Sequence, residues 1–217
     1  TYHMKEMFLD HLREGNEITE FYPEDIPSFC VGCKTCFLQG ELLCPHTAKT
    51  MPIWEAMLKS DLLVFAYPVY ALRAPASIKS LLDHLCVHWM VHRPDAQMFS
   101  KTAVILTNSV GAPNGSAQKD VKTSLSWMGV SNVYTCGAGM MGDVIWNKIS
   151  DEHVKMLERK TAGIYEKIKN LKPQHMKLRE RIKFFACKQI HKMVLKSEKT
   201  PSLDNQHYID HGWIKAK

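Results

Sequence analysis

Two uninterrupted apolar runs constrain the fold of this chain more than any other feature of its sequence. The first covers 61–67, is apolar after Asp61, and ends at Pro68, while the second covers 102–107. A strand with one covered face alternates apolar and polar residues, whereas a strand covered by helices on both faces is apolar throughout. We therefore expect both runs to be buried parallel strands.

Helical periodicity fills the intervals between the strands. Weaker strands are predicted at 17–22 and 132–137, and helices at 4–12, 51–59, 74–91, 116–128, 150–171 and 175–197. The final stretch, 208–213, is interpreted as an irregular arm. Strands that alternate with helices predict an α/β fold built on a doubly wound parallel sheet, with ligands at the carboxyl ends of the strands.

Four cysteines form a compact run with the spacing Cys30-x2-Cys33-x2-Cys36-x7-Cys44-Pro45. Thiolates at this spacing can converge on a [4Fe–4S] cluster or on a tetrahedral zinc ion. The alternative is a loop of free or redox-active thiols beside another cofactor. The spacing alone leaves these alternatives open.

Composition and charge describe a globular chain with a basic extension. Of the 217 residues, 45% are hydrophobic and 23% are charged. The odd count of 7 cysteines, four of them crowded into one segment, favours reduced thiols and a cytoplasmic location over a disulfide framework. Residues 172–217 carry 11 basic and 4 acidic side chains, so the whole excess of positive charge lies there. We expect a sheet domain at 1–171 and a basic helical extension at 172–217. That extension is either a solvated helix face or a surface for nucleic acid, anionic lipid or an acidic partner.

The loops after the two clearest strands suit a flat ring system. One loop begins with Pro68-Val69-Tyr70, and the other contains Thr107-Asn108-Ser109-Val110-Gly111-Ala112. An aromatic side chain can cover the face of a ring while backbone N–H groups reach its polar edge.

Short segments follow one another in an order that indicates a family. They are the cysteine run, Met51-Pro52-Ile53, Ser60-Asp61, Tyr67-Pro68-Val69-Tyr70, the stretch 74–84 and the loop 107–111. Together they resemble the flavodoxin-like NAD(P)H-dependent FMN reductases, including the branch called iron–sulfur flavoproteins, over roughly residues 1–170. The resemblance implies FMN as cofactor, NAD(P)H as co-substrate and no catalytic side chain, because the flavin N5 carries the hydride. It also implies that Cys30, Cys33, Cys36 and Cys44 either hold [4Fe–4S] or form a loop over the flavin without a metal. The residues implied for FMN are Thr1, Pro68, Val69, Tyr70, Ala71, Leu72, Thr107, Asn108, Ser109, Gly111 and Ala112.

The start of the sequence departs from the family pattern. Family members begin with a strand and a phosphate loop, and this sequence begins at what corresponds to the last threonine of that loop. Thr1 then opens the first helix, whose N-terminus would cradle the FMN phosphate. We expect that the family's first strand lies outside the sequence, or that another segment fills its place.

Other patterns leave the function class open. His84, His88 and His92 would share one helical face and could hold a metal, although a flavin pocket or a dimer contact would equally explain them. A small-molecule acceptor or a redox protein is expected as partner, with a homodimer, and with neither nucleic acid nor a membrane. The competing function is an electron-transfer or partner-binding protein on the same scaffold without substrate turnover.

Overall fold

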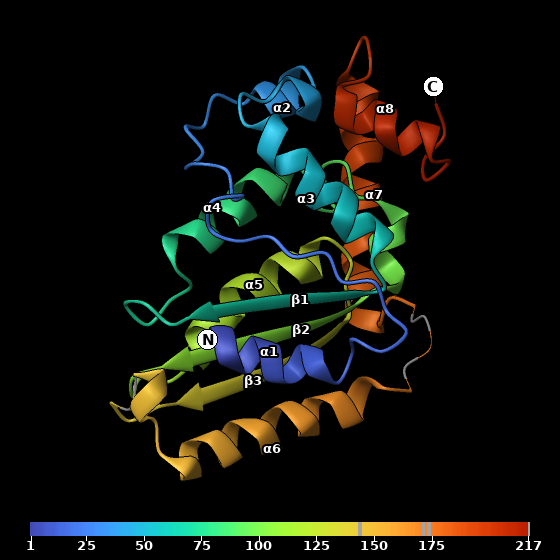
Figure 1. Ribbon diagram of the computed structural model, residues 1–217. Helices are drawn as coiled ribbons and strands as arrows, with labels where there is room; N and C mark the ends of the chain where they lie inside the picture. Colours follow the sequence, from blue (N-terminus) through green and yellow to red (C-terminus); the bar gives the residue numbers. More distant parts are fainter. Residues whose placement is uncertain (143–144, 171, 173–174, 217) are drawn as a thin grey trace.

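A computed structural model describes residues 1–142, 145–170, 172 and 175–216 of the chain (Figure 1). Its centre is a parallel sheet of β1 (Leu62–Pro68), β2 (Thr102–Ser109) and β3 (Asn132–Gly139), in that order. Leu62 pairs with Thr102, which pairs in turn with Asn132. Seven of the eight positions of the middle strand are buried, whereas β1, at the edge, is buried at alternate positions and half-buried between them. The prediction of parallel strands is confirmed, and that of full burial holds for β2 only.

Helices cover both faces of the sheet, as a doubly wound fold requires (Figure 1). On one face lie α3 (Thr47–Lys59), α4 (Ala76–Leu85) and α5 (Gly115–Trp127), which share a core with Ala103 and Ile105 of β2. On the other face lie α1 (Tyr2–Asp10) and α6 (Asp151–Ile168), which share a core with Val104 and Leu106. Successive residues of β2 thus enter opposite cores, because side chains alternate along a strand.

The C-terminal extension consists of α7 (Leu178–Ser197) and α8 (Leu203–Asp210). Its buried residues Cys187, Leu195 and Tyr208 form a third core with Met90 of the sheet domain. The Tyr208 hydroxyl donates a hydrogen bond to the Met90 carbonyl. The extension is therefore packed onto the sheet domain. None of the helices in the described residues is long and apolar enough to span a membrane.

Three expectations about elements are wrong. Residues 17–22 form no strand, since Lys5 of α1 binds the side chains of Glu20 and Tyr22 and holds the segment beside that helix. The helix expected over 74–91 ends at Leu85, and the chain tightens into a 3-10 turn, η2 (Cys86–His88). The Val87 carbonyl there accepts the Arg93 N–H at 3.0 Å. The stretch 208–213 belongs partly to α8, which the Ser202 hydroxyl caps by accepting the Asn205 N–H.

The remaining elements are short. They are α2 (Thr35–Leu38), η1 (Glu41–Leu43), η3 (Ala96–Ser100) and η4 (Trp146–Lys148). The first two shape the cysteine segment, which Figure 1 shows above α3 and α4, on the side away from the sheet.

Candidate functional site

The loop after β1 forms a tight turn with an apolar surface. Tyr70 and Arg73 exchange backbone hydrogen bonds of 3.1 and 2.9 Å, which closes the turn. The two residues between them, Ala71 and Leu72, have φ values of 48° and 63°, in the left-handed region that L-residues seldom occupy. Tyr70 is 63% exposed and Leu72 is 56% exposed. Strained backbone beside exposed apolar side chains is typical of a ligand-binding loop.

The loop after β2 lies directly beside it and offers hydrogen-bond donors. The Val69 N–H donates to the Asn108 carbonyl at 2.9 Å, which ties the two loops together. Thr107 is fully buried and its hydroxyl accepts from Gln118 Nε2 at 2.8 Å. Within the described residues, the backbone N–H groups of Val110, Gly111 and Ala112 donate to no protein acceptor. Three adjacent donors at the carboxyl ends of parallel strands suit the polar edge of a ligand.

A buried acceptor behind this loop was missed from the sequence. The Oδ1 atom of Asn114 is buried, and no described residue donates to it. Its Nδ2 atom lies 3.5 Å from the Ala138 carbonyl, so the amide is held between β3 and the start of α5. A buried polar atom without a partner costs free energy, and such atoms are frequent at ligand sites. The only sequence signal was the Pro113-Asn114-Gly115 turn, which is common in loops of every kind.

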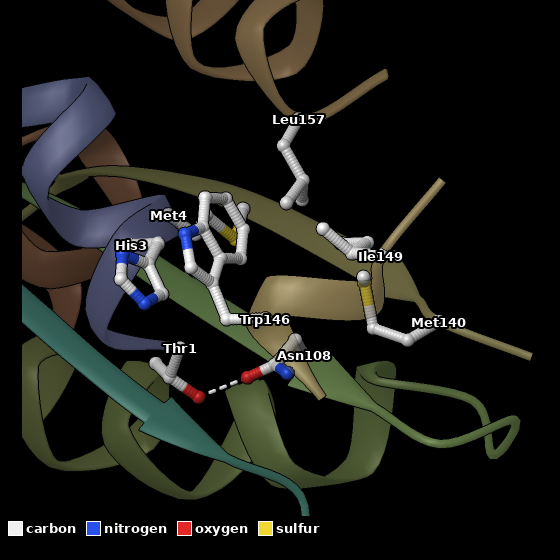
Figure 2. A pocket seen from close by; sticks show the side chains of 8 residues that line it. All are labelled: Thr1, His3, Met4, Asn108, Met140, Trp146, Ile149 and Leu157. Atoms are coloured by element: carbon white, nitrogen blue, oxygen red, sulfur yellow. Dashed lines mark hydrogen bonds between the residues drawn. The ribbon is translucent and has the colours of Figure 1, made fainter. Parts of the chain in front are cut away.

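A cavity of about 100 Å³ adjoins the loops on the side of α1 (Figure 2). The Thr1 hydroxyl, at the start of α1, donates to Asn108 Oδ1 at its rim. His3 and Trp146 stack with ring centroids 3.8 Å apart and form one wall. Pockets that enclose a whole cofactor measure roughly 300–1,000 Å³, so this cavity can enclose only part of one. The structure also places Trp146 in the lining of the site.

The residues implied for FMN therefore lie together. The loop 68–72, the loop 107–112 and Thr1 meet at the carboxyl ends of β1 and β2, where a doubly wound sheet binds ligands. Their role in holding FMN stays a prediction.

The cysteine segment, residues 30–44, lies beside α4 and away from the loop 68–72. The Ser80 hydroxyl in the middle of α4 contacts the carbonyls of Pro27 and Ser28, and His46 contacts His84 near the end of that helix at 2.6 Å. The segment therefore runs beside the C-terminal half of α4, whereas the loop 68–72 precedes the N-terminus of that helix. At 1.5 Å per residue, the ten residues of α4 separate its two ends by about 15 Å.

The thiols of Cys30, Cys33 and Cys44 lie near that of Cys36, but among the described residues the four do not form a metal site. Cys30 and Cys33 are exposed, and Cys36 and Cys44 are half-buried. Burial, with smaller contributions from Cys44, Cys30 and Cys33, raises the pKa of the Cys36 thiol. In the described part of the chain, no three His, Cys, Asp or Glu side chains are arranged to hold a metal ion. Four thiols are the ligands that a cluster requires, but here they are not brought close enough together to bind one jointly.

The three histidines do not converge either. Because the helix ends at Leu85, His84 turns to His46, His88 stacks on Trp54 at 3.8 Å, and His92 bonds Asp204 at 2.8 Å. A common metal site for these three residues is therefore a wrong expectation.

His88 gives the fold a measurable pH dependence. Burial lowers its pKa to about 4, so below pH about 6.5 the unfolded chain takes up a proton before the folded chain does. Full stability is present above that range and is lost as the pH falls towards 4. We expect the free energy of unfolding to drop by about 2 kcal/mol from this residue between pH 7 and pH 5. Urea titrations at both pH values test this, and His88→Phe, which preserves stacking on Trp54, should remove that part of the drop. An equal pH dependence in the variant would contradict the assignment.

A parallel sheet with helices on both faces, and a donor-bearing loop pair at its carboxyl edge, defines a flavodoxin-like protein. The chain belongs to the NADPH-dependent FMN reductase family, whose sequence profile matches residues 1–139. The suspected family and the flavodoxin-like fold class are thus confirmed, and membership supports FMN as the cofactor. The residues present fit FMN chemically: within the described residues the site offers the unpartnered acceptor of Asn114, three N–H donors and an exposed apolar loop.

Two curated relatives carry the name iron–sulfur flavoprotein. The one from Archaeoglobus fulgidus is 27% identical over 149 residues, which are 67% of this chain and 64% of that protein. The one from Methanosarcina thermophila is 24% identical over 139 residues, which are 64% of this chain and 70% of that protein. The match thus spans just under two thirds of the first relative's length.

Solved structures share the fold. A flavone reductase superposes with a TM-score of 0.58 at 12% identity, covering 99% of this chain and 93% of that one. An azoreductase, AzrA, gives a TM-score of 0.55 at 18% identity, covering 77% and 91% of the two chains. The apo form of an NADH:FMN oxidoreductase gives 0.53 at 19% identity, covering 80% and 86%. At these identities the likeness concerns the fold alone.

Proposed function

We propose that this protein is an FMN-dependent oxidoreductase that takes electrons from NAD(P)H and delivers them to a small-molecule or protein acceptor. The observation that carries the proposal is the pairing of two loops at the carboxyl edge of the sheet, one apolar and strained, the other with three N–H donors that bond to no acceptor among the described residues. Family membership supports the same class of reaction.

The chain's own residues bind and orient rather than transfer protons. When bound, FMN supplies the hydride and electron chemistry. The exposed side chains of Tyr70 and Leu72 offer an apolar surface to a ring, and the N–H groups of Val110, Gly111 and Ala112 offer hydrogen bonds to its polar edge. The N-terminal end of α1, beside Thr1, offers a favourable electrostatic environment for a phosphate.

Turnover of NAD(P)H tests this proposal directly. The protein loaded with FMN should oxidise NADH or NADPH in the presence of a quinone or ferricyanide, followed by the loss of nicotinamide absorbance. We expect activity to depend on bound FMN and to fall to background in protein stripped of it. If the loaded protein oxidises neither nicotinamide with any acceptor, the proposed reaction is wrong.

A second candidate is an iron–sulfur electron carrier, favoured by the four-thiol segment and by the names of the two curated relatives. The thiols differ in exposure, and a hydrogen bond from Thr35 lowers the pKa of Cys33, which favours the thiolate form that metals bind. We derive no reaction step through a cluster, because the described thiols do not make a closed set of ligands.

Anaerobic reconstitution with iron and sulfide distinguishes the two candidates. If the thiols hold a cluster, the chain should retain about four irons, and Cys33→Ser should lose most of them. Cys136→Ala is the matched control, because Cys136 is buried in β3 and far along the chain from the cysteine segment. Equal iron retention in wild type and Cys33→Ser would contradict cluster binding by this segment.

A further inference from the structure

Helix α7 carries an apolar stripe on the face that points away from the protein. Its buried side, which contains Cys187, His191 and Leu195, packs towards α5 and α8. In Figure 1 this helix runs along one side of the molecule, from the level of the sheet to α8. The apolar stripe consists of Leu178 (71% exposed), Ile182 (58%), Phe185 (62%) and Met193 (63%). At 3.6 residues per turn these four fall within a sector of about 80°, opposite the buried side. Gln189 lies in the same sector between Phe185 and Met193, so the stripe is interrupted there. Four large exposed apolar side chains on one face of a packed helix nevertheless indicate a surface that another body covers.

The two edges of the apolar stripe differ in chemistry. Arg181, Lys188 and Lys192 follow one edge. The other edge carries Ile190 and Val194, each 43% exposed, and one exposed cation, Arg179. The single acidic residue of α7, Glu180, is buried and accepts the Ser126 hydroxyl at 2.7 Å, so it does not offset these cations on the exposed face. The chain's excess of positive charge is also concentrated in this extension. The exposed face is thus mainly apolar in the middle, with most of its cations along one edge and Arg179 on the other.

This charge pattern disfavours a second copy of the chain as the body that covers the stripe. In an antiparallel pair of α7 helices the same edges would face each other, which would place the cations of one copy against those of the other. In a parallel pair the basic edge would lie against Ile190 and Val194, where its charges would lose water without gaining partners. A protein partner would in addition need acidic groups in register with the basic edge. An anionic lipid surface can cover the apolar stripe and also supply negative charge to the cations, and it needs no shape complementarity. Apolar side chains enter the interface while Lys and Arg remain at the headgroups.

We propose that the exposed face of α7 binds the surface of an anionic membrane, with the apolar stripe in the interfacial region and Arg181, Lys188 and Lys192 on lipid phosphates. The protein lies on the bilayer and does not cross it, in agreement with the absence of a spanning helix from the described residues. This proposal departs from the expectation of no membrane partner, which was made from the sequence. It does not depend on the flavin reaction, because α7 lies outside the loops at the carboxyl edge of the sheet.

Vesicle binding by the full chain tests the proposal. We expect co-sedimentation with phosphatidylglycerol-containing vesicles, weak binding to phosphatidylcholine alone, and release by high salt. Arg181→Gln combined with Lys192→Gln should weaken binding about 25-fold, at roughly fivefold per cation. Phe185→Gln should weaken it about tenfold through lost apolar contact. The double change Lys155→Gln and Lys167→Gln on exposed positions of α6 is the matched control and should leave binding unchanged.

Several results would overturn the proposal. Failure to bind anionic vesicles would do so, as would equal binding by wild type and the Phe185→Gln variant. A dimer in sedimentation velocity that Phe185→Gln dissociates, without vesicle binding, would make the apolar stripe an interface between two copies. NAD(P)H oxidation in solution is measured separately, so failure of vesicle binding and failure of the proposed reaction remain distinguishable.

Discussion

Arg93→Met is expected to lower the free energy of unfolding by about 4 kcal/mol, because it removes the cation from a nearly buried ionic network. Arg93 is only 7% exposed, and its guanidinium contacts Glu41 at 3.1 Å. It also pairs with Asp204 of α8 and donates to the Cys36 carbonyl. One side chain thus joins the cysteine segment, the η2 region and the C-terminal extension. Without it, Glu41 and the Cys36 carbonyl lose this donor. Asp204 loses its ion pair while retaining its contact with His92. Urea unfolding monitored by circular dichroism measures the change.

Arg73→Met is the matched control for this prediction. Arg73 also pairs with a carboxylate, that of Asp120, but its side chain is 66% exposed. Exposed pairs contribute about 1 kcal/mol or less, so this variant should stay close to wild type. The Cys36 thiol should meanwhile react faster with an alkylating reagent in Arg93→Met, because its segment has lost an anchor. A loss of stability no larger than that of Arg73→Met would show that the network does not hold these elements together.

The sheet was predictable because its signal is local. The runs that became β1 and β2 are apolar on both faces, and their lengths of 7 and 8 residues are typical of strands and short for helices. The strand expected at 17–22 failed because a strand exists only through pairing with a neighbour. Its sequence does not record that Lys5 would hold its side chains beside α1.

Only the part of the site that directly follows the strands could be predicted from the sequence. The loops 68–72 and 107–112 each follow a parallel strand, which predicts that they lie side by side. The hydrogen bond from the Val69 N–H to the Asn108 carbonyl confirms this. Helical periodicity gave a wrong prediction where the α-helix ends and a 3-10 turn follows. The histidines His84, His88 and His92 share a face only on a continuous α-helix, and the 3-10 turn at η2 sends them in different directions. The Arg93 network joins residues more than fifty positions apart in sequence, and no local pattern announces such a contact.

Gly111→Val is expected to weaken FMN binding about 100-fold while leaving the fold intact. A Cβ at Gly111 meets no atom within 4 Å and its φ is not in the left-handed region, so the free protein should accept the side chain. The branched group would instead stand over the N–H donors of residues 110–112. Two hydrogen bonds lost at about 1–1.5 kcal/mol each amount to roughly two orders of magnitude in affinity. Titration of FMN fluorescence against protein measures the dissociation constant.

Gly163→Val supplies the matched control for the flavin loop. Gly163 lies on α6, and a Cβ there likewise meets nothing within 4 Å, so the same atoms are added at an equally open position. Its FMN affinity should equal that of wild type. Because both variants should keep the wild-type urea midpoint, a selective loss in Gly111→Val must come from the loop itself. An unchanged dissociation constant in Gly111→Val would place the flavin away from the 107–112 loop, and the three N–H donors would then need another explanation.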